Sequence, residues 1–422
     1  MKDGKQMADQ LQAITANRLL SGTGDSPVEN AVVLVSDGRI SAAGSRANIP
    51  IPANAQIIDL GKRTLLPGLI DAHVHFYTAG VDSMILRSIE PSPRKLIRAV
   101  GEAARLLQAG FTATRDMGYG DAVYLKQAIE AGEIPGPRMA TPRYMIVQTG
   151  GSPDPHWLPR EFVDQFDYRC RLADGIAEVQ QAAREQLRGG ADFLKIMASG
   201  GLGERHGLKD TYHYTLDELK AIVEEGHKLG VRVAAHAIGA PAVKNAVLAG
   251  VDTIEHGSYV DDEALDLMAE HDVIFIPTLG IMQAFAAGPA GISRDRAQEV
   301  LDEGMARVSQ AGDRGIRIAA GTDFGGVPLT KHGNNAIEAE LLVEAGLSPT
   351  EALTAITLRG AQAMGREAEF GSVEVGKLAD LVATGVDPHS DIRALQAVDF
   401  VMKGGQVVRL PAARTKKAEL SA

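Results

Sequence analysis

The chain alternates short apolar runs with longer stretches in which Ala, Leu and Glu recur at helical spacing. Eight apolar runs in its middle part have the length of buried strands. Amphipathic stretches such as PRKLIRAVGEAARLLQAG and TLDELKAIVEEGHKLG separate most of them. Strands that alternate with helices predict parallel βαβ units. The expected strands are residues 66–75, 111–116, 138–147, 192–198, 231–236, 252–256, 273–278 and 317–322.

Both ends of the chain show a different pattern, in which short β-branched runs are separated by turns. QAITANRLLSG and NAVVLVSDGRISAAG lie near the beginning, and GSVEVGKLADLVATG and DFVMKGGQVVRL lie near the end. Asp37-Gly38 is a strong signal for a two-residue hairpin turn. We predict one small β-sandwich domain, residues 1–65 plus 368–422, beside a central domain of residues 66–367.

Eight strand–helix units fit a (β/α)8 TIM barrel, and a doubly wound open sheet is the alternative. Polar residues repeatedly end the apolar runs. This favours the barrel, because the carboxyl ends of barrel strands meet at one face and carry the active site. The predicted fold class is therefore α/β, a TIM barrel with a small β-sandwich formed from both termini.

Composition limits the classes of partner. The 422 residues include 43 basic and 54 acidic side chains, a net charge of -11, which argues against nucleic acid and favours a small-molecule substrate. Cys170 is the only cysteine, so no disulfide forms within the chain and a reducing compartment suits it. Without an apparent signal peptide or membrane span, we expect a cytoplasmic protein with no membrane partner.

The ends of the expected strands carry residues that bind metals. Side chains two apart on a strand share a face, so His73 and His75 can reach one ion. A single H-x-H is a weak indication, but further polar residues end other expected strands, where a barrel would bring them together. The combined set is His73, His75, Lys195, His236, His256 and Asp323.

Lys195 stands apart in this set because an ammonium group only donates and cannot bind a cation. Two interpretations remain open from the residues. Lys195 either packs its stem in the barrel and pairs with a carboxylate, or has a lowered pKa and has reacted with carbon dioxide. The resulting carbamate would be anionic and able to bridge two metal ions.

The chain resembles the amidohydrolase superfamily over nearly its whole length. The resemblance rests on the strand-end residues together with LLPGLIDAHVH, GTDFGG and ADLV. KIMASGG and HAIGAPAVKNAVLAGVDTIEHGS are most similar to its branch of imidazolonepropionase-related enzymes, X-Pro dipeptidases and ochratoxin-type amide hydrolases. The resemblance implies two divalent ions, with Zn²⁺ favoured and manganese or cobalt also compatible. It places one ion on His73, His75 and Asp323 and the other on His236 and His256, bridged by carboxylated Lys195.

The resemblance also implies the chemistry, in which hydroxide activated by the metal ions cleaves an amide bond. Asp323, His236 and Lys195 are the expected catalytic residues, with Asp323 as general acid and base. Substrate recognition is expected from loops after the strands. The candidates are His156, Tyr212, Tyr214 and His332. A solvated loop position is an equal alternative for His156 and the favoured interpretation for His332. Glu255 is expected to point away from the site by strand alternation.

The expected substrate is an N-acyl amino acid, a dipeptide or an ochratoxin-like amide. A cyclic amide, urea or carbamate is the alternative, as in imidazolonepropionase-like or phenylurea-type enzymes. A barrel that binds a ligand without turnover is a third possibility, but loss of Lys195 or Asp323 would be its expected mark. We also expect a homo-oligomer.

Overall fold

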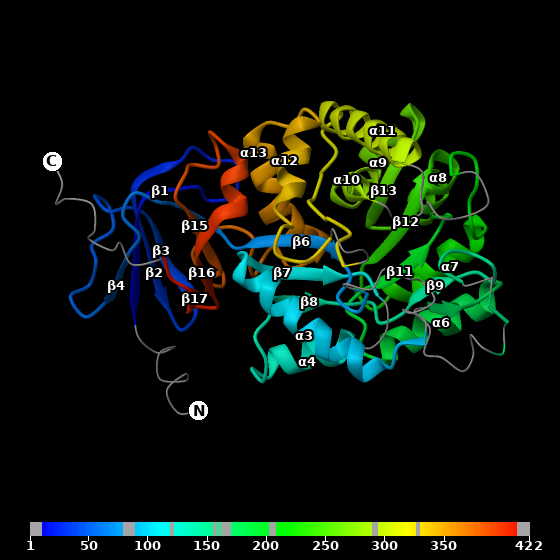
Figure 1. Cartoon of the computed structure of the whole chain (residues 1–422), viewed down its shortest axis with the longest axis horizontal. Helices are drawn as coiled ribbons and strands as arrows, with labels where there is room; N and C mark the ends of the chain where they lie inside the picture. The colour runs from blue at the N-terminus through cyan, green and yellow to red at the C-terminus, as the bar shows by residue number, and fades with distance from the viewer. Residues whose placement is uncertain are drawn as a thin grey trace.

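The computed structural model describes residues 11–78, 89–118, 122–154, 158–159, 161, 170–201, 208–288, 294–325 and 330–411. A sheet built from both ends of the chain lies at one side of the molecule, and strands and helices of the middle part make up the rest (Figure 1). In the described part, no helix combines the length and apolarity that a bilayer crossing requires.

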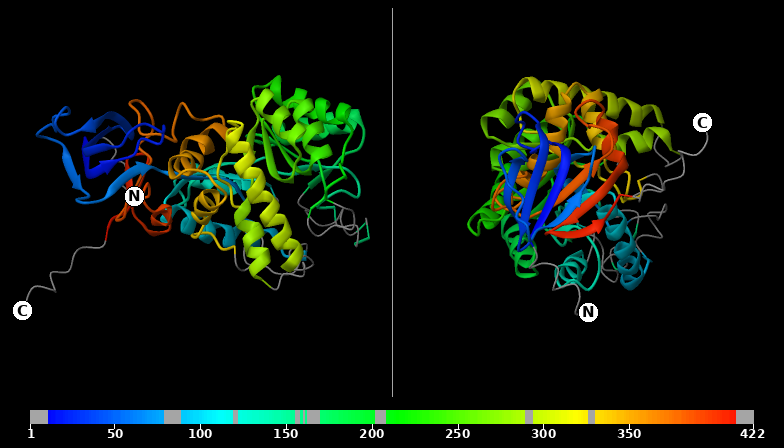
Figure 2. Two further views of the ribbon diagram at one scale, coloured as in Figure 1. Left: turned by 90° about the horizontal axis from the view of Figure 1, so that it is seen from above. Right: turned by 90° about the vertical axis from the view of Figure 1, so that its left-hand side faces the viewer.

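The two ends of the chain share one eight-stranded sheet, which lies toward the viewer in the right-hand view of Figure 2. β5 pairs antiparallel with β15 and so joins the first part of the chain to the last. Between β2 and β3, Asp37 and Gly38 both have positive φ (52° and 73°), as a type I′ turn requires, and the predicted hairpin is confirmed. The strands are β1 (Gln12–Leu19), β2 (Val28–Ser36), β3 (Arg39–Ser45), β4 (Gln56–Asp59), β5 (Thr64–Pro67), β15 (Leu381–Thr384), β16 (Val398–Lys403) and β17 (Gln406–Arg409).

The middle part contains two parallel sheets. The first has the order β6-β7-β8, and the second has the order β10-β9-β11-β12-β13-β14. All their pairs are parallel, as the alternation of strands and helices predicts. The strands are β6 (Leu69–Val74), β7 (Phe111–Asp116), β8 (Arg138–Ala140), β9 (Met145–Val147), β10 (Cys170–Leu172), β11 (Leu194–Met197), β12 (Val233–Gly239), β13 (Thr253–Tyr259) and β14 (Ile274–Ile276).

Two expected strands differ from the structure. The run 138–147 is divided into β8 and β9, because Pro142 has no N–H to donate and Arg143 has a left-handed φ of 61°. The run 317–322 forms only isolated bridges, Ile318 with Phe275 and, just beyond its end, Phe324 with Val74. The predicted third strand is thus longer than the observed ones, and the predicted eighth strand is more regular than the observed segment.

Residues 317–324 nevertheless make backbone hydrogen bonds on both sides. The N–H of Phe275 in β14 donates to the carbonyl of Arg317 at 2.8 Å. On the other side, Ala72 in β6 donates to the carbonyl of Ala320 at 2.9 Å. This segment therefore lies between the outer strands of the two parallel sheets.

Helices cover the strands of the middle part above, below and to the right in Figure 1. α7 begins with a capping box, in which the hydroxyl of Thr215 accepts from the N–H of Glu218 and the Glu218 carboxylate accepts from the N–H of Thr215. The helices are α3 (Ser92–Gln108), α4 (Ala122–Glu130), α6 (Ile176–Arg188), α7 (Leu216–His227), α8 (Ala240–Ala249), α9 (Asp262–Glu270), α10 (Leu279–Ala287), α11 (Arg294–Asp313), α12 (Ile337–Glu344), α13 (Pro349–Thr354), η1 (Ala355–Arg359), α14 (Gly360–Ala363) and η2 (Ile392–Ala397).

Candidate metal centre

The six side chains expected to bind metal come from neighbouring elements of the middle part. All are buried except Asp323, whose side chain is 21% exposed. His73 lies in β6, and His75 is the first residue after this strand. Lys195 lies in β11, His236 in β12 and His256 in β13, and Asp323 lies in the segment 317–324.

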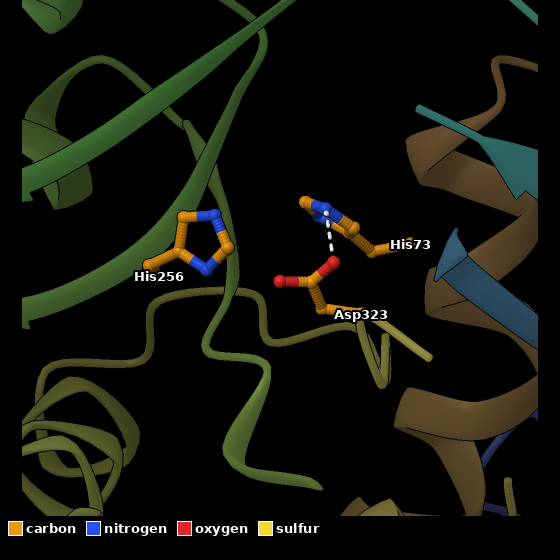
Figure 3. Close-up of side chains that lie close together, drawn as sticks. All are labelled: His73, His256 and Asp323. Atoms are coloured by element: carbon orange, nitrogen blue, oxygen red, sulfur yellow. Dashed lines mark ion pairs between the residues drawn. The ribbon is translucent and has the colours of Figure 1, made fainter. Parts of the chain in front are cut away.

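Asp323 lies among the histidines. Its Oδ1 is 3.1 Å from Nε2 of His75 and 3.6 Å from Nε2 of His73, and Figure 3 shows His256 facing the same carboxylate. His73, His256 and Asp323 offer donor atoms that all lie within 4.8 Å of one another. The ring of His236 is 4.5 Å from that of His256, centroid to centroid. Three nearby donors of nitrogen and oxygen can hold a divalent cation.

Three of the rings have a hydrogen-bond partner at Nδ1, and that of His75 is the carbonyl of Gly118 at 3.3 Å. His73 Nδ1 is 2.7 Å from Oε2 of Glu255, and His256 Nδ1 is 2.7 Å from the hydroxyl of Thr278. Such partners fix the ring and leave the other nitrogen for an ion. In His73 that other nitrogen is the Nε2 beside Asp323.

Three imidazoles of the site, those of His73, His236 and His256, are kept neutral. Burial lowers the pKa of His236 to about 3, and Lys195 acts in the same direction. Burial also holds the pKa values of His73 and His256 well below that of an ordinary imidazole. Neutral imidazole is the form that binds metal ions. His236 uses Nε2 to contact the carbonyl of Gly200 at 3.1 Å, which leaves its Nδ1 as the nitrogen for an ion.

Asp323 is held as a carboxylate. Burial acts to raise its pKa, but His73, His75 and Lys195 outweigh this effect, and the pKa lies below the ordinary value. A deprotonated carboxylate binds a cation and accepts a proton, so Asp323 has the protonation state that both roles require.

Lys195 is a buried amine, 2% exposed, whose Nζ makes no hydrogen bond to any described residue. Burial lowers its pKa to about 8, with Arg115 acting in the same direction and Glu255 and Asp323 opposing it. Buried polar atoms are almost always hydrogen-bonded, so an exception calls for a physical reason. A group bound to this nitrogen would supply one, and the donor set therefore fits a centre with a modified lysine.

Comparison with known proteins assigns the chain to a family. Residues 64–408 match the model of the Amidohydrolase family. The chain belongs to this family. Ochratoxinase of Aspergillus niger is 32% identical over 427 residues, which cover 94% of this chain and 86% of the relative. Imidazolonepropionase of Symbiobacterium thermophilum is 25% identical over 404 residues, which cover 88% of each protein.

Among solved structures, a Xaa-Pro dipeptidase with bound methionine in its active site has a TM-score of 0.86 and 32% identity. The match covers 95% of this amidohydrolase and 100% of that chain. The predicted superfamily and branch are confirmed, as is the enzyme class of hydrolases that act on carbon–nitrogen bonds. The α/β fold class is confirmed as well.

The expectation that Glu255 points away from the site is wrong. The parallel register of β12 and β13 pairs His236 with Glu255, and the Glu255 carboxylate contacts both His73 and Arg115. His256 follows with a left-handed φ of 75°, which breaks the alternation of a regular strand. An acidic residue inside an apolar run, with an arginine in another, was the available sequence signal.

The candidates for substrate binding lie in different environments. His156 is outside the described residues. Tyr212 is 53% exposed, whereas Tyr214 is buried and its hydroxyl donates to the carbonyl of Ala173 at 3.0 Å. Burial raises the pKa of Tyr214, so its phenol stays neutral. Of the two tyrosines, Tyr212 is the one with a largely exposed side chain.

His332 is buried, with 2% of its surface exposed, rather than solvated. Its ring packs 4.9 Å from that of Phe76, and its backbone N–H donates to Glu102 at 3.3 Å. Burial lowers the pKa of His332 to about 4. His332 is therefore a neutral imidazole packed against the residue that follows His75.

Proposed function

We propose that this amidohydrolase uses two divalent metal ions to hydrolyse an amide bond in a small molecule such as an N-acyl amino acid, a dipeptide or an ochratoxin-like amide. The observation that carries the proposal is the convergence of His73, His256 and Asp323 within 4.8 Å beside the buried amine of Lys195. Ochratoxinase, at 32% identity over 94% of the chain, supports the substrate class.

In this proposal His73, His75 and Asp323 would hold one ion, and His236 and His256 would hold the other. A carbamate on Lys195 would be an anionic ligand shared by both. The lowered pKa of Lys195 supports this modification, because only a neutral amine adds carbon dioxide. The mixture of imidazole and carboxylate donors favours Zn²⁺.

Divalent ions bound here would supply activation of a water molecule and polarisation of the substrate carbonyl. Asp323 accepts the proton of the attacking water and passes it to the leaving amine nitrogen, so that a carboxylic acid and an amine are released. Its carboxylate is suited to this task because it is deprotonated, partly exposed and 3.1 Å from Nε2 of His75. His236 in β12 and Lys195 in β11 are the other two proposed catalytic residues.

We also propose that the two parallel sheets belong to one closed (β/α)8 barrel, residues 66–367, with residues 1–65 and 368–422 as the second domain. The support is the segment 317–324, whose hydrogen bonds reach β14 and β6. β8 and β9, at the other edge of the first sheet and within the second, are consecutive in the chain. In such a barrel, the expected ligands lie at the carboxyl ends of the strands.

The experiment that tests the function is a substrate panel with protein loaded with Zn²⁺, Mn²⁺ or Co²⁺. The panel contains N-acyl amino acids, X-Pro dipeptides, an ochratoxin-type amide, a cyclic amide and a urea, with amine release as the readout. We expect turnover of an open-chain amide and about two ions per chain, as a two-metal site requires. Turnover of the cyclic amide or urea alone would replace the proposed substrate class, and full activity without bound metal would overturn the mechanism.

A further inference from the structure

A buried chain of hydrogen bonds runs from His73 through Glu255 to Arg115. His73 Nδ1 lies 2.7 Å from Oε2 of Glu255, and Nη2 of Arg115 donates to Oε1 of the same carboxylate at 2.6 Å. We infer that Glu255 is a positioning residue that presents His73 to the metal ion, and that Arg115 fixes Glu255. This inference rests on the proposed metal-dependent function.

Arg115, in β7, is hydrogen-bonded to two other strands. Its Nε donates to the carbonyl of Ala72 in β6 at 2.8 Å, and its Nη1 donates to the hydroxyl of Thr253 in β13 at 3.2 Å. The guanidinium also lies over the ring of Phe193, 5.2 Å from its centroid. Arg115 and Glu255 are 1% and 0% exposed, so neither side chain has freedom to turn toward water. The carboxylate is thus held in one orientation.

That orientation determines which nitrogen of His73 can bind an ion. A carboxylate flanked by an arginine only accepts hydrogen bonds, so Nδ1 of His73 must carry the hydrogen. Nε2 then presents its lone pair, on the side where it lies 3.6 Å from Asp323. Without Glu255 the ring could adopt the other tautomer, in which the hydrogen on Nε2 faces the ion and prevents binding.

A purely structural ion pair is the competing interpretation, since Arg115 and Glu255 join β7 to β13. Removing one partner of a buried ion pair destabilises a protein even when no ligand is involved. The two interpretations differ in what they predict for metal affinity. A structural pair affects the folding equilibrium alone, whereas a positioning residue affects binding to the folded protein.

Glu255→Gln separates these possibilities while preserving side-chain volume. The amide has one accepting oxygen, but the carboxylate accepts from Arg115 and Thr253 on one side and from His73 on the other. If the amide nitrogen faces His73, the hydrogen of the ring moves to Nε2. If it faces Arg115, two donors oppose each other. The first arrangement removes the lone pair from Nε2, and the second breaks the contact with Arg115 that holds the side chain in place beside His73.

Glu225→Gln is the matched control. Glu225 in α7 is also buried, 1% exposed, and its carboxylate pairs with Arg184 at 2.7 Å and Lys228 at 2.6 Å. It therefore reproduces the loss of a buried, paired carboxylate without a histidine partner. We expect it to lower stability and to leave metal affinity unchanged.

The measurement is competition between the folded protein and a chelator for Zn²⁺, with ions counted per chain. We expect Glu255→Gln to lower the affinity for one of the two ions by about 10- to 100-fold, the usual effect of losing an outer-shell partner. Wild-type affinity in folded Glu255→Gln, or an equal loss in Glu225→Gln, would overturn the inference. Failure of the wild-type protein to bind Zn²⁺ would instead contradict the proposed function.

If Glu255→Gln does not fold, Glu255→Asp decides the question. The shorter side chain keeps the charge but cannot reach His73 and Arg115 together. A folded aspartate variant should again bind one ion more weakly than the wild type. Undiminished affinity in that variant would overturn the inference.

Discussion

Asp71 and Thr322 are joined by two hydrogen bonds beneath the candidate metal centre. The backbone N–H of Thr322 donates to Oδ1 of Asp71 at 3.0 Å, and the Thr322 hydroxyl donates to Oδ2 at 2.7 Å. Oδ1 also accepts from the N–H of His73 at 3.1 Å, and Oδ2 accepts from Asn335 at 2.7 Å. One buried carboxylate therefore ties the backbone of His73 to that of the residue preceding Asp323.

Asp71→Asn should lower both stability and turnover. An asparagine cannot accept all four hydrogen bonds of Asp71, so at least one buried donor loses its partner, at a cost of about 1–3 kcal/mol. Urea unfolding measures this loss of stability. Steady-state kinetics measures the loss of turnover that we expect when the backbone at His73 and Asp323 shifts. Asp192→Asn is the control, because Asp192 accepts from the backbone of Thr141 and pairs with Lys126 away from the site. Equal losses of turnover in both variants would contradict the specific role of Asp71.

Glu338 should make the stability of the protein depend on pH. Burial raises its pKa in the folded chain to about 8, from an ordinary value of 4.5, while the N–H groups of Leu279 and Gly280 oppose the shift. Between these pH values the unfolded chain releases a proton that the folded chain retains. The contribution to stability is therefore complete below about pH 4.5 and is lost as the pH rises toward 8.

The test compares Glu338→Gln with the wild type by urea unfolding at several pH values. Since the glutamine does not titrate, the stability advantage of the wild type should shrink by about 1.4 kcal/mol per pH unit over this range. Other titrating groups cancel in the difference between the two proteins. A difference that is constant with pH would show that Glu338 does not titrate in this way.

Local sequence patterns predicted the strand-end residues because a side chain at the end of a parallel strand has its position determined by topology. His73 lies next to the last residue of β6, whereas Lys195 and His236 lie within β11 and β12, and the order of the parallel strands places all three. Glu255 could not be placed, since its contact with Arg115 is long-range and the left-handed backbone of His256 alters the alternation. Alternation is reliable only while the backbone stays in the β region.

The irregular form of the segment 317–324 was hidden for the same reason. Asp323 has a positive φ of 56°, and only single bridges flank it. Its apolar residues have the composition of a strand, yet its role is to turn one carboxylate toward His73 and His75. The polar residue at the end of this apolar run thus lies beside His73 and His75 as expected, whereas the backbone around it differs from the expected strand.

Gly325→Ala tests the geometric reason for the glycine in GTDFGG. Gly325 has a φ of 113°, and a Cβ there would lie 1.6 Å from the carbonyl oxygen of His75. The backbone of His75, a proposed metal ligand, would have to move, so we expect the free energy of unfolding to fall by more than about 2 kcal/mol and metal binding to weaken. Gly376→Ala is the control, with a φ of 92° and open space around the Cβ position. If the two variants bind metal equally well, the close approach to His75 is not important.

Lys195→Ala should abolish turnover, which short carboxylic acids such as propionate should partly restore by replacing the carbamate. Turnover should fall by at least about 100-fold, because the loss of an outer-shell partner alone can lower activity by that factor. Carbon-13 NMR after incubation with labelled bicarbonate should show a carbamate signal that the variant lacks. Lys403→Ala is the control, since burial also lowers the pKa of Lys403 to about 8 but its Nζ donates to the carbonyl of Gly136. A fully active Lys195→Ala enzyme would exclude the bridging role.

Asp323→Asn should separate metal binding from proton transfer. The amide oxygen can still contact an ion, and the imidazoles of His73, His75 and His256 remain, so we expect the metal content to stay largely unchanged. The amide cannot accept the proton of the attacking water, and turnover should fall by about 10²- to 10⁴-fold, the usual contribution of a general acid–base group. Metal analysis and steady-state kinetics on the same preparation distinguish a missing base from a missing ion. Near-normal turnover with full metal content would assign the proton transfer to another residue, and loss of both ions would make Asp323 chiefly a ligand.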